Sequence, residues 1–128
     1  MKKITIVFIA ALFFLTGCEL SYGKRVKIND SLEIYVKGDS VTEADGKKLG
    51  NYLAELWKDA SNMKSLQLSK DKGAYVVRMV IDQKLVASNP SYNEAFKAVK
   101  DLIAQEVFTG SKVEFITTDE RFNDLKSY

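Results

Sequence analysis

Few residue types in this 128-residue chain could perform chemistry. The chain contains no histidine and one cysteine, Cys18. Histidine is the usual general base and a frequent metal ligand, and cysteine is the usual thiolate nucleophile. We therefore expect no Ser-His-Asp triad and no zinc site built from cysteine and histidine. An enzyme made from this chain would have to use Asp, Glu, Lys or Tyr.

The cysteine directly follows a short hydrophobic run near the amino terminus. After Met1, Lys2 and Lys3 the chain is uncharged from Ile4 to Leu15 ("ITIVFIAALFFL"), and small residues follow at 16 and 17. A basic start, a short apolar run and small residues are the order of parts in an export signal peptide. The run is too short to span a membrane as a helix, which needs about 20 apolar residues.

Residues 15–18, Leu-Thr-Gly-Cys, resemble the lipobox of bacterial lipoproteins. The resemblance implies cleavage before Cys18, a diacylglycerol on its sulfur and an N-acyl chain, typically palmitate. Two or more acyl chains hold a protein on a membrane stably, whereas one is marginal. Because Glu19 rather than aspartate follows, the resemblance favours the outer membrane if the cell is Gram-negative. The alternatives are a secretory signal with a chance cysteine and an uncleaved anchor.

These features divide the chain into three parts. We expect a cleaved signal peptide at 1–17, the lipidated cysteine with a short tether at 18–25, and one globular domain at 26–128. A tether of this length reaches on the order of 25 Å, so the domain stays beside the bilayer. Without Lys2 and Lys3, basic and acidic residues are equal in number. A neutral domain lacks the net positive charge that attracts nucleic acid or an anionic lipid surface.

Hydrophobic periodicity predicts an α+β domain whose first half contains one strand and one helix. Apolar and polar residues alternate over 31–37, which predicts a strand with one buried face. Thr42 with Asp45 predicts a capping box that begins an amphipathic helix of about 18 residues. Gly46 and Gly50 lie inside this helix at a cost in helix propensity, so we expect them to allow a close approach to a sheet.

The second half is predicted to contain three strands and one further helix. The predicted elements are a strand beginning at Leu66, a hairpin turn at 70–73, a strand at 74–82, a helix at 91–107 followed by Gly110 in a left-handed conformation, and a strand at 113–117. Ser91 with Glu94 predicts a second capping box, and residues 118–128 form a polar tail. The order βαββαβ predicts a ferredoxin-like two-layer sandwich, in which two helices cover one face of an antiparallel sheet.

Two segments resemble a recurrent domain of uncharacterised bacterial proteins. They are "VTEADGKKLGNYL" at 41–53 and "YVVRMV" at 75–80. The resemblance supports the ordered domain and implies no activity.

One segment, "KGAYVVRM" at 72–79, partly matches the motif of RNA-recognition domains. The positions that stack on bases are aromatic in that motif. Here they are Ala74, Val76 and Met79. We therefore expect no nucleic acid partner.

No motif predicts a catalytic or metal site. Ser-x-x-Lys spacing occurs at 21–24, 61–64 and 69–72 without the accompanying motifs of penicillin-recognising enzymes. Asp119, Glu120 and Asp124 could supply oxygen ligands to calcium, but they lack the spacing and central glycine of a calcium loop. We predict no catalytic residue, no metal and no cofactor other than the lipid on Cys18.

The predicted sheet has one face packed on the helices and one open face. The residues expected on the open face, and proposed as an interaction surface, are Tyr35, Val76, Arg78, Val80 and Ile116. Exposed apolar surface of this kind often binds another protein. The alternative is that Phe122, Leu125 or the segment "RVKI" at 25–28 folds back and covers this face.

The favoured function is a non-enzymatic interaction or accessory module of the cell envelope, whose partner is an unidentified envelope protein. A binder of small ligands or peptides, including an inhibitor or immunity lipoprotein, is the alternative. A glycan-cleaving enzyme is a third hypothesis, because glycoside hydrolysis needs only two carboxylates about 5 to 9.5 Å apart.

Overall fold

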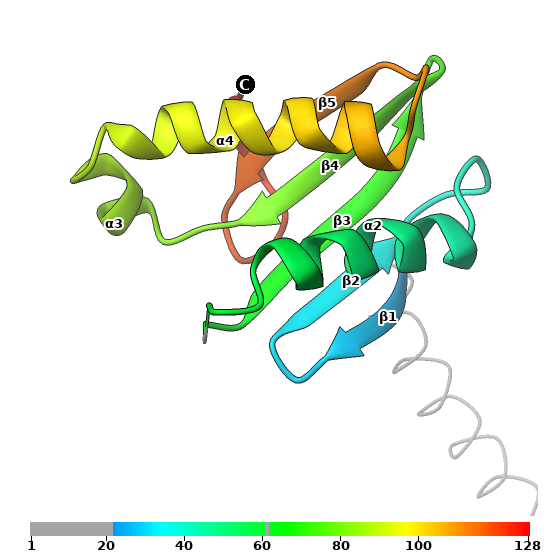
Figure 1. The fold of residues 1–128 in the computed structure, drawn as a ribbon, viewed down its shortest axis with the longest axis horizontal. Coiled ribbons are helices and arrows are strands. Elements are labelled where there is room, and N and C mark those ends of the chain that lie inside the picture. Colours follow the sequence, from blue (N-terminus) through cyan, green and yellow to red (C-terminus); the bar gives the residue numbers. More distant parts are fainter. Residues whose placement is uncertain (1–21, 61) are drawn as a thin grey trace, which may run out of the picture.

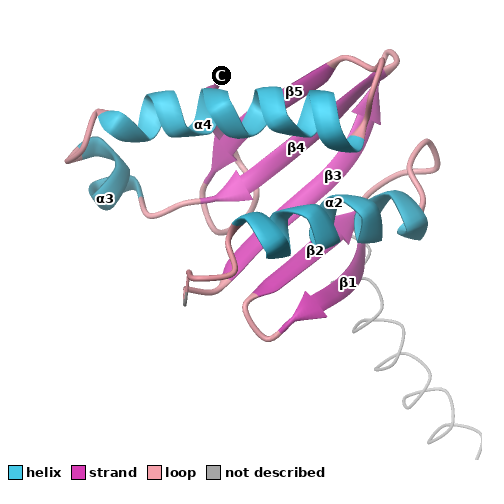
Figure 2. Ribbon diagram, viewed as in Figure 1, coloured by secondary structure: helices cyan, strands magenta, loops and turns pink. Residues whose placement is uncertain are grey.

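A computed structural model describes residues 22–60 and 62–128 as one six-stranded sheet with helices on one face (Figure 1). The strands, in chain order and in spatial order, are β1 (Lys24–Asn29), β2 (Leu32–Val36), β3 (Lys64–Asp71), β4 (Ala74–Val80), β5 (Val113–Thr118) and β6 (Asp124–Ser127). The described helices are α2 (Glu43–Leu56), the short α3 (Gln83–Ala87), α4 (Ser91–Leu102) and its π-helical continuation η1 (Ile103–Val107). Helices α2 and α4 lie side by side over the same sheet face (Figure 2).

The sheet is mixed, and two parallel strand pairs each flank a helical crossover. The pairs β2/β3 and β4/β5 are parallel, with α2 and α4 as their crossovers, whereas β1/β2, β3/β4 and β5/β6 are antiparallel. The α+β class is confirmed. The ferredoxin-like topology is not, because there the strands joined by a helix are split by another strand, and here they are neighbours. The order of elements along a chain does not distinguish these arrangements.

Both outer strands were missing from the sequence-based prediction. Strand β1 begins at Lys24, within the segment expected to be tether, and pairs with β2. Strand β6 pairs with β5 in the segment expected to be a polar tail. Edge strands have only one neighbour and less cover, so their sequences carry weaker apolar alternation. The short helix α3 was also not predicted.

The start of α2 follows the prediction. The Asp45 amide donates to Thr42 Oγ1 at 3.1 Å, and the Thr42 amide donates to Asp45 Oδ2 at 3.0 Å, so the capping box is confirmed. The helix ends at Leu56, with Trp57 as its C-cap, and is therefore 14 residues long rather than about 18.

The two glycines of α2 lie where the helix meets the sheet. A Cβ added at Gly46 would lie 2.6 Å from Val36 Cγ2, and one added at Gly50 would lie 2.3 Å from Ile28 Cδ1. These distances are too short for carbon atoms, so the predicted close approach of helix and sheet is confirmed.

The predicted capping box at Ser91 and Glu94 is wrong. Pro90 is the N-cap of α4 and has helical dihedral angles, so Ser91 is already inside the helix. Asn89 instead accepts from Ser91 through its Oδ1 atom, at 3.1 Å from the amide and 2.7 Å from the hydroxyl. Gly110 has a φ of 82°, as expected for a left-handed residue after the helix.

The hairpin between β3 and β4 forms within the predicted turn at 70–73, although Lys70 and Asp71 still belong to β3. Asp71 pairs with Ala74, and the two residues between them, Lys72 and Gly73, have φ angles of 51° and 82°. Two consecutive positive φ angles are typical of the tight turn that joins antiparallel strands.

The core lies between the helices and the sheet. Its fully buried large side chains include Ile34, Leu49, Leu53, Leu66, Leu68, Val77, Ile103, Val107 and Phe115. On each strand the residues between these core positions must point to the opposite face, because side chains alternate along a strand.

Candidate functional site

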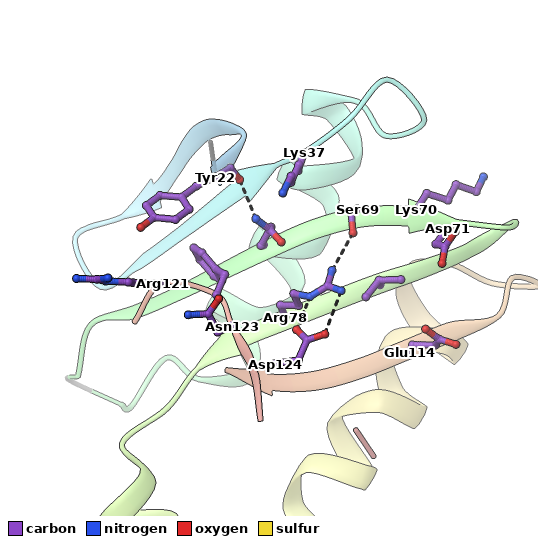
Figure 3. A pocket seen from close by; sticks show the side chains of 13 residues that line it. Tyr22, Lys37, Ser69, Lys70, Asp71, Arg78, Glu114, Arg121, Asn123 and Asp124 are labelled. Carbon is purple, nitrogen blue, oxygen red and sulfur yellow. Dashed lines mark hydrogen bonds and ion pairs between the residues drawn. The ribbon is translucent and has the colours of Figure 1, made fainter. Parts of the chain in front are cut away.

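A groove of about 780 Å³ crosses the sheet face that the helices leave open (Figure 3). Its floor is formed by Gln67 and Ser69 on β3, Val76 and Arg78 on β4, and Glu114 on β5. These residues alternate with the core residues of the same strands, so the pleat of the sheet positions all five. The floor is mostly polar and carries charge.

Segments outside the central strands form the rim of the groove. Tyr22 and Lys37 line it from the side of β1 and β2. Residues 121–123 line it from the connection between β5 and β6, and Asp124 lines it from the start of β6. Asp71 lies at the end of the groove beside the β3–β4 hairpin, whereas the neighbouring Lys70 side chain points away from it (Figure 3). The groove thus depends on residues distant in the sequence.

A chain reversal at Gly23 places Tyr22 on the open face. Gly23 has a φ of +103°, and a Cβ added there would lie 2.5 Å from the carbonyl oxygen of Val36, so only glycine fits. Gln67 Nε2 donates to the carbonyl oxygen of Tyr22 at 3.0 Å. The chain segment that precedes β1 is therefore attached to the groove floor.

Three aromatic rings, which we call the aromatic clasp, cover the open face beside β2. Tyr22, Tyr35 and Phe122 contact one another edge to face, with centroid distances of 6.0 Å for the two tyrosines, 5.5 Å for Tyr22 and Phe122, and 5.7 Å for Tyr35 and Phe122. Such pairs contribute about 0.5 to 1.5 kcal/mol each beyond area burial. The clasp joins the chain before β1 to the connection before β6.

The connection that carries Phe122 is held by Asp119. Its carboxylate accepts from the Asn123 amide at 3.0 Å, from Asn123 Nδ2 at 3.0 Å and from the Arg121 amide at 2.9 Å. The bonds from Asn123, followed by smaller effects of Arg121, lower the pKa of Asp119, because they stabilise the charged carboxylate. Phe122 itself has a φ of 61°, a conformation that this turn imposes on a non-glycine residue.

Arg78 lies at the centre of the groove and is held from two sides. Its Nε donates to Asp124 Oδ1 at 2.7 Å and its Nη2 to Asp124 Oδ2 at 3.4 Å, while Nη1 donates to Ser69 Oγ at 3.3 Å. The Arg78 side chain is 24% exposed. The fork-like pair with Asp124 fixes the guanidinium and links β6 to β4 across β5.

A second polar network occupies the open face on the outer side of the clasp. Glu33 is 8% exposed, and its Oε1 accepts from Arg25 Nε at 2.8 Å while its Oε2 accepts from Ser65 Oγ at 2.9 Å. A buried carboxylate requires such partners. Hydrogen bonds thus satisfy both oxygens of the Glu33 carboxylate.

Charges of both signs line the groove. Within residues 22–60 and 62–128, the lining cations Lys37 and Arg121 have no ion-pair partner. Of the lining carboxylates, Asp124 is paired with Arg78, Glu114 lies 3.9 Å from Lys112, and Asp71 has no ion-pair partner among the described residues. The Lys70 ammonium lies over the Tyr75 ring on the helical side, so the cations and carboxylates that face the groove are equal in number.

All five residues of the predicted interaction surface lie on the open face. Val76, 3% exposed, and Arg78 line the groove, whereas Tyr35 belongs to the clasp and Val80 and Ile116 are half-buried. The face is thus a polar groove with an aromatic cover rather than an open apolar patch.

Part of the alternative prediction for this face is confirmed. Phe122 folds back across the sheet. Leu125 does not, since it lies on edge strand β6 and is 43% exposed. The segment 25–28 extends the sheet as β1 instead of covering it.

Sequence reasoning missed most of the groove residues, among them Lys37, Gln67 and Arg121. A signal existed for Gln67, because it lies between the core residues Leu66 and Leu68 and must face the other way. Arg121 belongs to an irregular connection whose path is set by distant contacts, so no periodicity indicates it.

Other predicted features take places outside this groove or outside the described residues. Cys18 lies before the described residues. The acidic residues considered for calcium have structural partners at Asp119 and Asp124, and the described part of the chain contains no group of three acidic, histidine or cysteine side chains able to hold a metal ion. Among residues 22–60 and 62–128, no helix combines the length and apolarity needed to cross a membrane.

The fold and its groove define a small α+β domain in which two βαβ units and two edge strands form one mixed sheet. Residues 25–128 match the AF_1994_N family, described as a family N-terminal domain. The chain therefore belongs to this family, which supports the resemblance of its ordered part to an uncharacterised domain family. No curated protein and no solved structure matches the chain.

Proposed function

We propose that this chain is a bacterial envelope lipoprotein, anchored through Cys18, that binds another envelope protein in the groove on its open sheet face. The observation that carries the proposal is the groove itself, which gathers polar and charged side chains from three strands and two rim segments. Recessed sites with a few converging polar groups are the usual places where proteins bind partners or ligands.

The position of Tyr22 supports a function beside the membrane. Four peptide units separate Cys18 from Tyr22, which is hydrogen-bonded to the groove floor through its carbonyl oxygen. At about 3.3 to 3.6 Å per residue, these units span at most about 14 Å. A lipid on Cys18 would hold the groove close to the surface of the membrane, with the outer membrane favoured in a Gram-negative cell.

The partners of the groove carboxylates support binding rather than catalysis. Glycoside hydrolysis needs one carboxyl group to act as an acid and another as a base or nucleophile. Here Arg78 engages both oxygens of Asp124, and Glu114 is next to Lys112. Among the described residues this leaves Asp71 as the one lining carboxylate without an ion-pair partner, so no pair of free carboxylates is present in the groove. We propose no catalytic residue and no cofactor beyond the lipid.

A binder of small ligands or peptides, such as an inhibitor or immunity lipoprotein, is the second candidate. The groove volume of about 780 Å³ supports it, since small-molecule sites usually enclose about 300 to 1,000 Å³.

Photocrosslinking in living cells tests the proposed partner. A photoreactive amino acid replaces Glu114 in the groove, and in a matched strain it replaces Lys97, which is exposed on the helical side. We expect a defined crosslinked protein from position 114 and none from position 97. Equal products from both positions, or none from position 114, would contradict binding in the groove.

The substitution Cys18→Ser tests the anchor. We expect the variant to leave the membrane fraction and to lose the incorporation of labelled palmitate, while the unaltered chain retains both. A variant that still sediments with membranes after a high-salt wash would show that lipid on Cys18 is not the anchor.

A further inference from the structure

A second pocket, of about 240 Å³, lies on the helical side of the sheet. It is formed where the C-terminal end of α2 meets the β1–β2 hairpin and the start of β3. Lys64 lines the pocket from β3, two residues before the core residue Leu66, so both side chains point to the same face of the sheet. The sheet itself therefore separates this pocket from the groove.

The walls of the pocket are mostly apolar. Leu32 is 3% exposed and Leu53 is fully buried, and both line the pocket together with Ala54 and the indole ring of Trp57. The volume is below the range of about 300 to 1,000 Å³ that is usual for ligand sites. A ligand of this pocket would therefore be small and have an apolar body.

The charged residues that line the pocket are Asp30, Lys58 and Lys64. Asp30 lies 3.4 Å from Lys27, and Lys58 lies 3.5 Å from Glu55. Lys64 has no ion-pair partner in the described part of the chain. The pocket thus contains one positive charge without a counterion.

The Lys64 ammonium group also has donors to spare. It carries three N–H donors. The carbonyl oxygen of Asn62 accepts one of them at 3.2 Å, and no other oxygen of the described residues accepts from this group. The Trp57 ring, whose centroid is 5.4 Å from Nζ, supplies a weaker attraction. Burial lowers the pKa of Lys64, because the charged form has lost part of its contact with water.

The local charge suits a single carboxylate. The carbonyl groups at the C-terminal end of α2 carry about half a negative charge, which offsets only part of the full charge on Lys64. Asp59 follows Lys58 in the chain but does not line the pocket. A carboxylate supplies one negative charge, whereas a phosphate monoester carries about 1.5 to 2 at neutral pH and would exceed what the site can balance.

We propose that this pocket binds a small monocarboxylate, whose oxygens accept from Lys64 Nζ and whose apolar body packs against Leu53 and Trp57. The site is distinct from the groove, so the inference goes beyond the proposed function. A carboxylate next to an apolar group occurs both in free aliphatic acids and at the carboxyl terminus of a peptide.

Trp57 is the only tryptophan of the chain and lines the pocket, so its fluorescence reports binding directly. The full lipoprotein in neutral detergent is titrated with hexanoate and with N-acetylleucine, and each acid is compared with its uncharged amide. We expect at least one acid to bind at least about tenfold more tightly than its amide, because hydrogen bonds to charged groups are the stronger ones. Tighter binding of hexanoate would assign the site to free acids, and tighter binding of N-acetylleucine to peptide termini.

Three variants locate the binding. Lys64→Met removes the ammonium group and keeps a long side chain, whereas Lys48→Met makes the same change of charge at an exposed position of α2 outside the pocket. We expect Lys64→Met to raise the Kd of the acid at least about tenfold and Lys48→Met to change it less than about twofold. Ala54→Leu keeps Lys64 but fills the pocket, so it should weaken binding as strongly as Lys64→Met. Circular dichroism checks that all three variants are folded.

Several results would overturn the inference. Equal binding of the acids and their amides would show that the pocket does not select a carboxylate. Equal weakening by Lys64→Met and Lys48→Met would indicate general electrostatic attraction instead of a site. If Ala54→Leu binds the acid as tightly as the unaltered chain, the ligand lies outside this pocket.

Discussion

Alanine at Gly46 is expected to destabilise the domain, although alanine favours helices. The added Cβ would lie 2.6 Å from Val36 Cγ2. Val36 is buried and β-branched, so it cannot easily rotate away. Overpacking of this kind costs about 1 to 3 kcal/mol, while the gain in helix propensity is at most about 1 kcal/mol. We therefore expect the free energy of unfolding to fall by about 1 to 2 kcal/mol.

Gly50→Ala, in the same helix, is expected to destabilise the domain less than Gly46→Ala. Alanine there would meet Ile28 at 2.3 Å from its Cδ1 and Cγ1 atoms. Ile28 is half-buried on edge strand β1, so it can yield to the added methyl group more easily than the buried Val36. The overpacking cost should therefore be near its lower limit of about 1 kcal/mol and be largely offset by helix propensity. We expect a loss below about 1 kcal/mol.

Urea unfolding followed by circular dichroism measures both effects, and each kcal/mol should lower the Tm by about 4 to 8 °C. Asn51 is exposed in the same helix, so its side chain has no close contact with the sheet. The difference in stability between Asn51→Ala and Asn51→Gly therefore measures what alanine gains over glycine from helix propensity alone. Val36→Ala removes the methyl group that the added Cβ would meet. The double variant Gly46→Ala, Val36→Ala should therefore be at least about 1 kcal/mol more stable than the sum of the two single losses predicts. If Gly46→Ala stabilises the domain as much as alanine over glycine at position 51, the close approach of α2 to the sheet is refuted.

Three further predictions concern the open face. Phe122→Ala removes two ring pairs and should lower the free energy of unfolding by about 1 to 3 kcal/mol. It should also expose the chain around Tyr22 to limited proteolysis, and unchanged cleavage there would contradict the clasp. Arg78→Lys keeps the charge but loses the two-point contact with the Asp124 carboxylate. Urea unfolding should show a loss of no more than about 1 kcal/mol in the free energy of unfolding, since the pair is partly exposed. A larger loss would mean that this pair is a principal support of β6. The pKa of Asp119 is lower in the folded chain than its ordinary value of 3.8, so its stabilisation is complete above that pH and is lost as the pH falls through the folded pKa. NMR shifts of the Asn123 amide should follow this titration and lose it in Asp119→Asn, and an unchanged titration in that variant would assign it to another group.

Local signals in the sequence determined several parts of the fold. The Thr42 capping box, the hairpin turn at residues 72 and 73 and the left-handed Gly110 depend on contacts or dihedral angles within a few residues. Such interactions are present in any fold that forms the same helix or turn. The alternation of apolar residues likewise determined which side of each central strand enters the core.

Tertiary structure alone decided which strands are neighbours and what covers the open face. A strand's sequence shows which of its faces is apolar, but the choice of pairing partner depends on packing over the whole sheet. The edge strands β1 and β6 are each held in the sheet by hydrogen bonds to a single neighbouring strand. The clasp joins Tyr22, Tyr35 and Phe122 across a hundred residues of chain, and only the folded sheet brings them together. The groove exists for the same reason, because its side chains come from segments that no local periodicity connects.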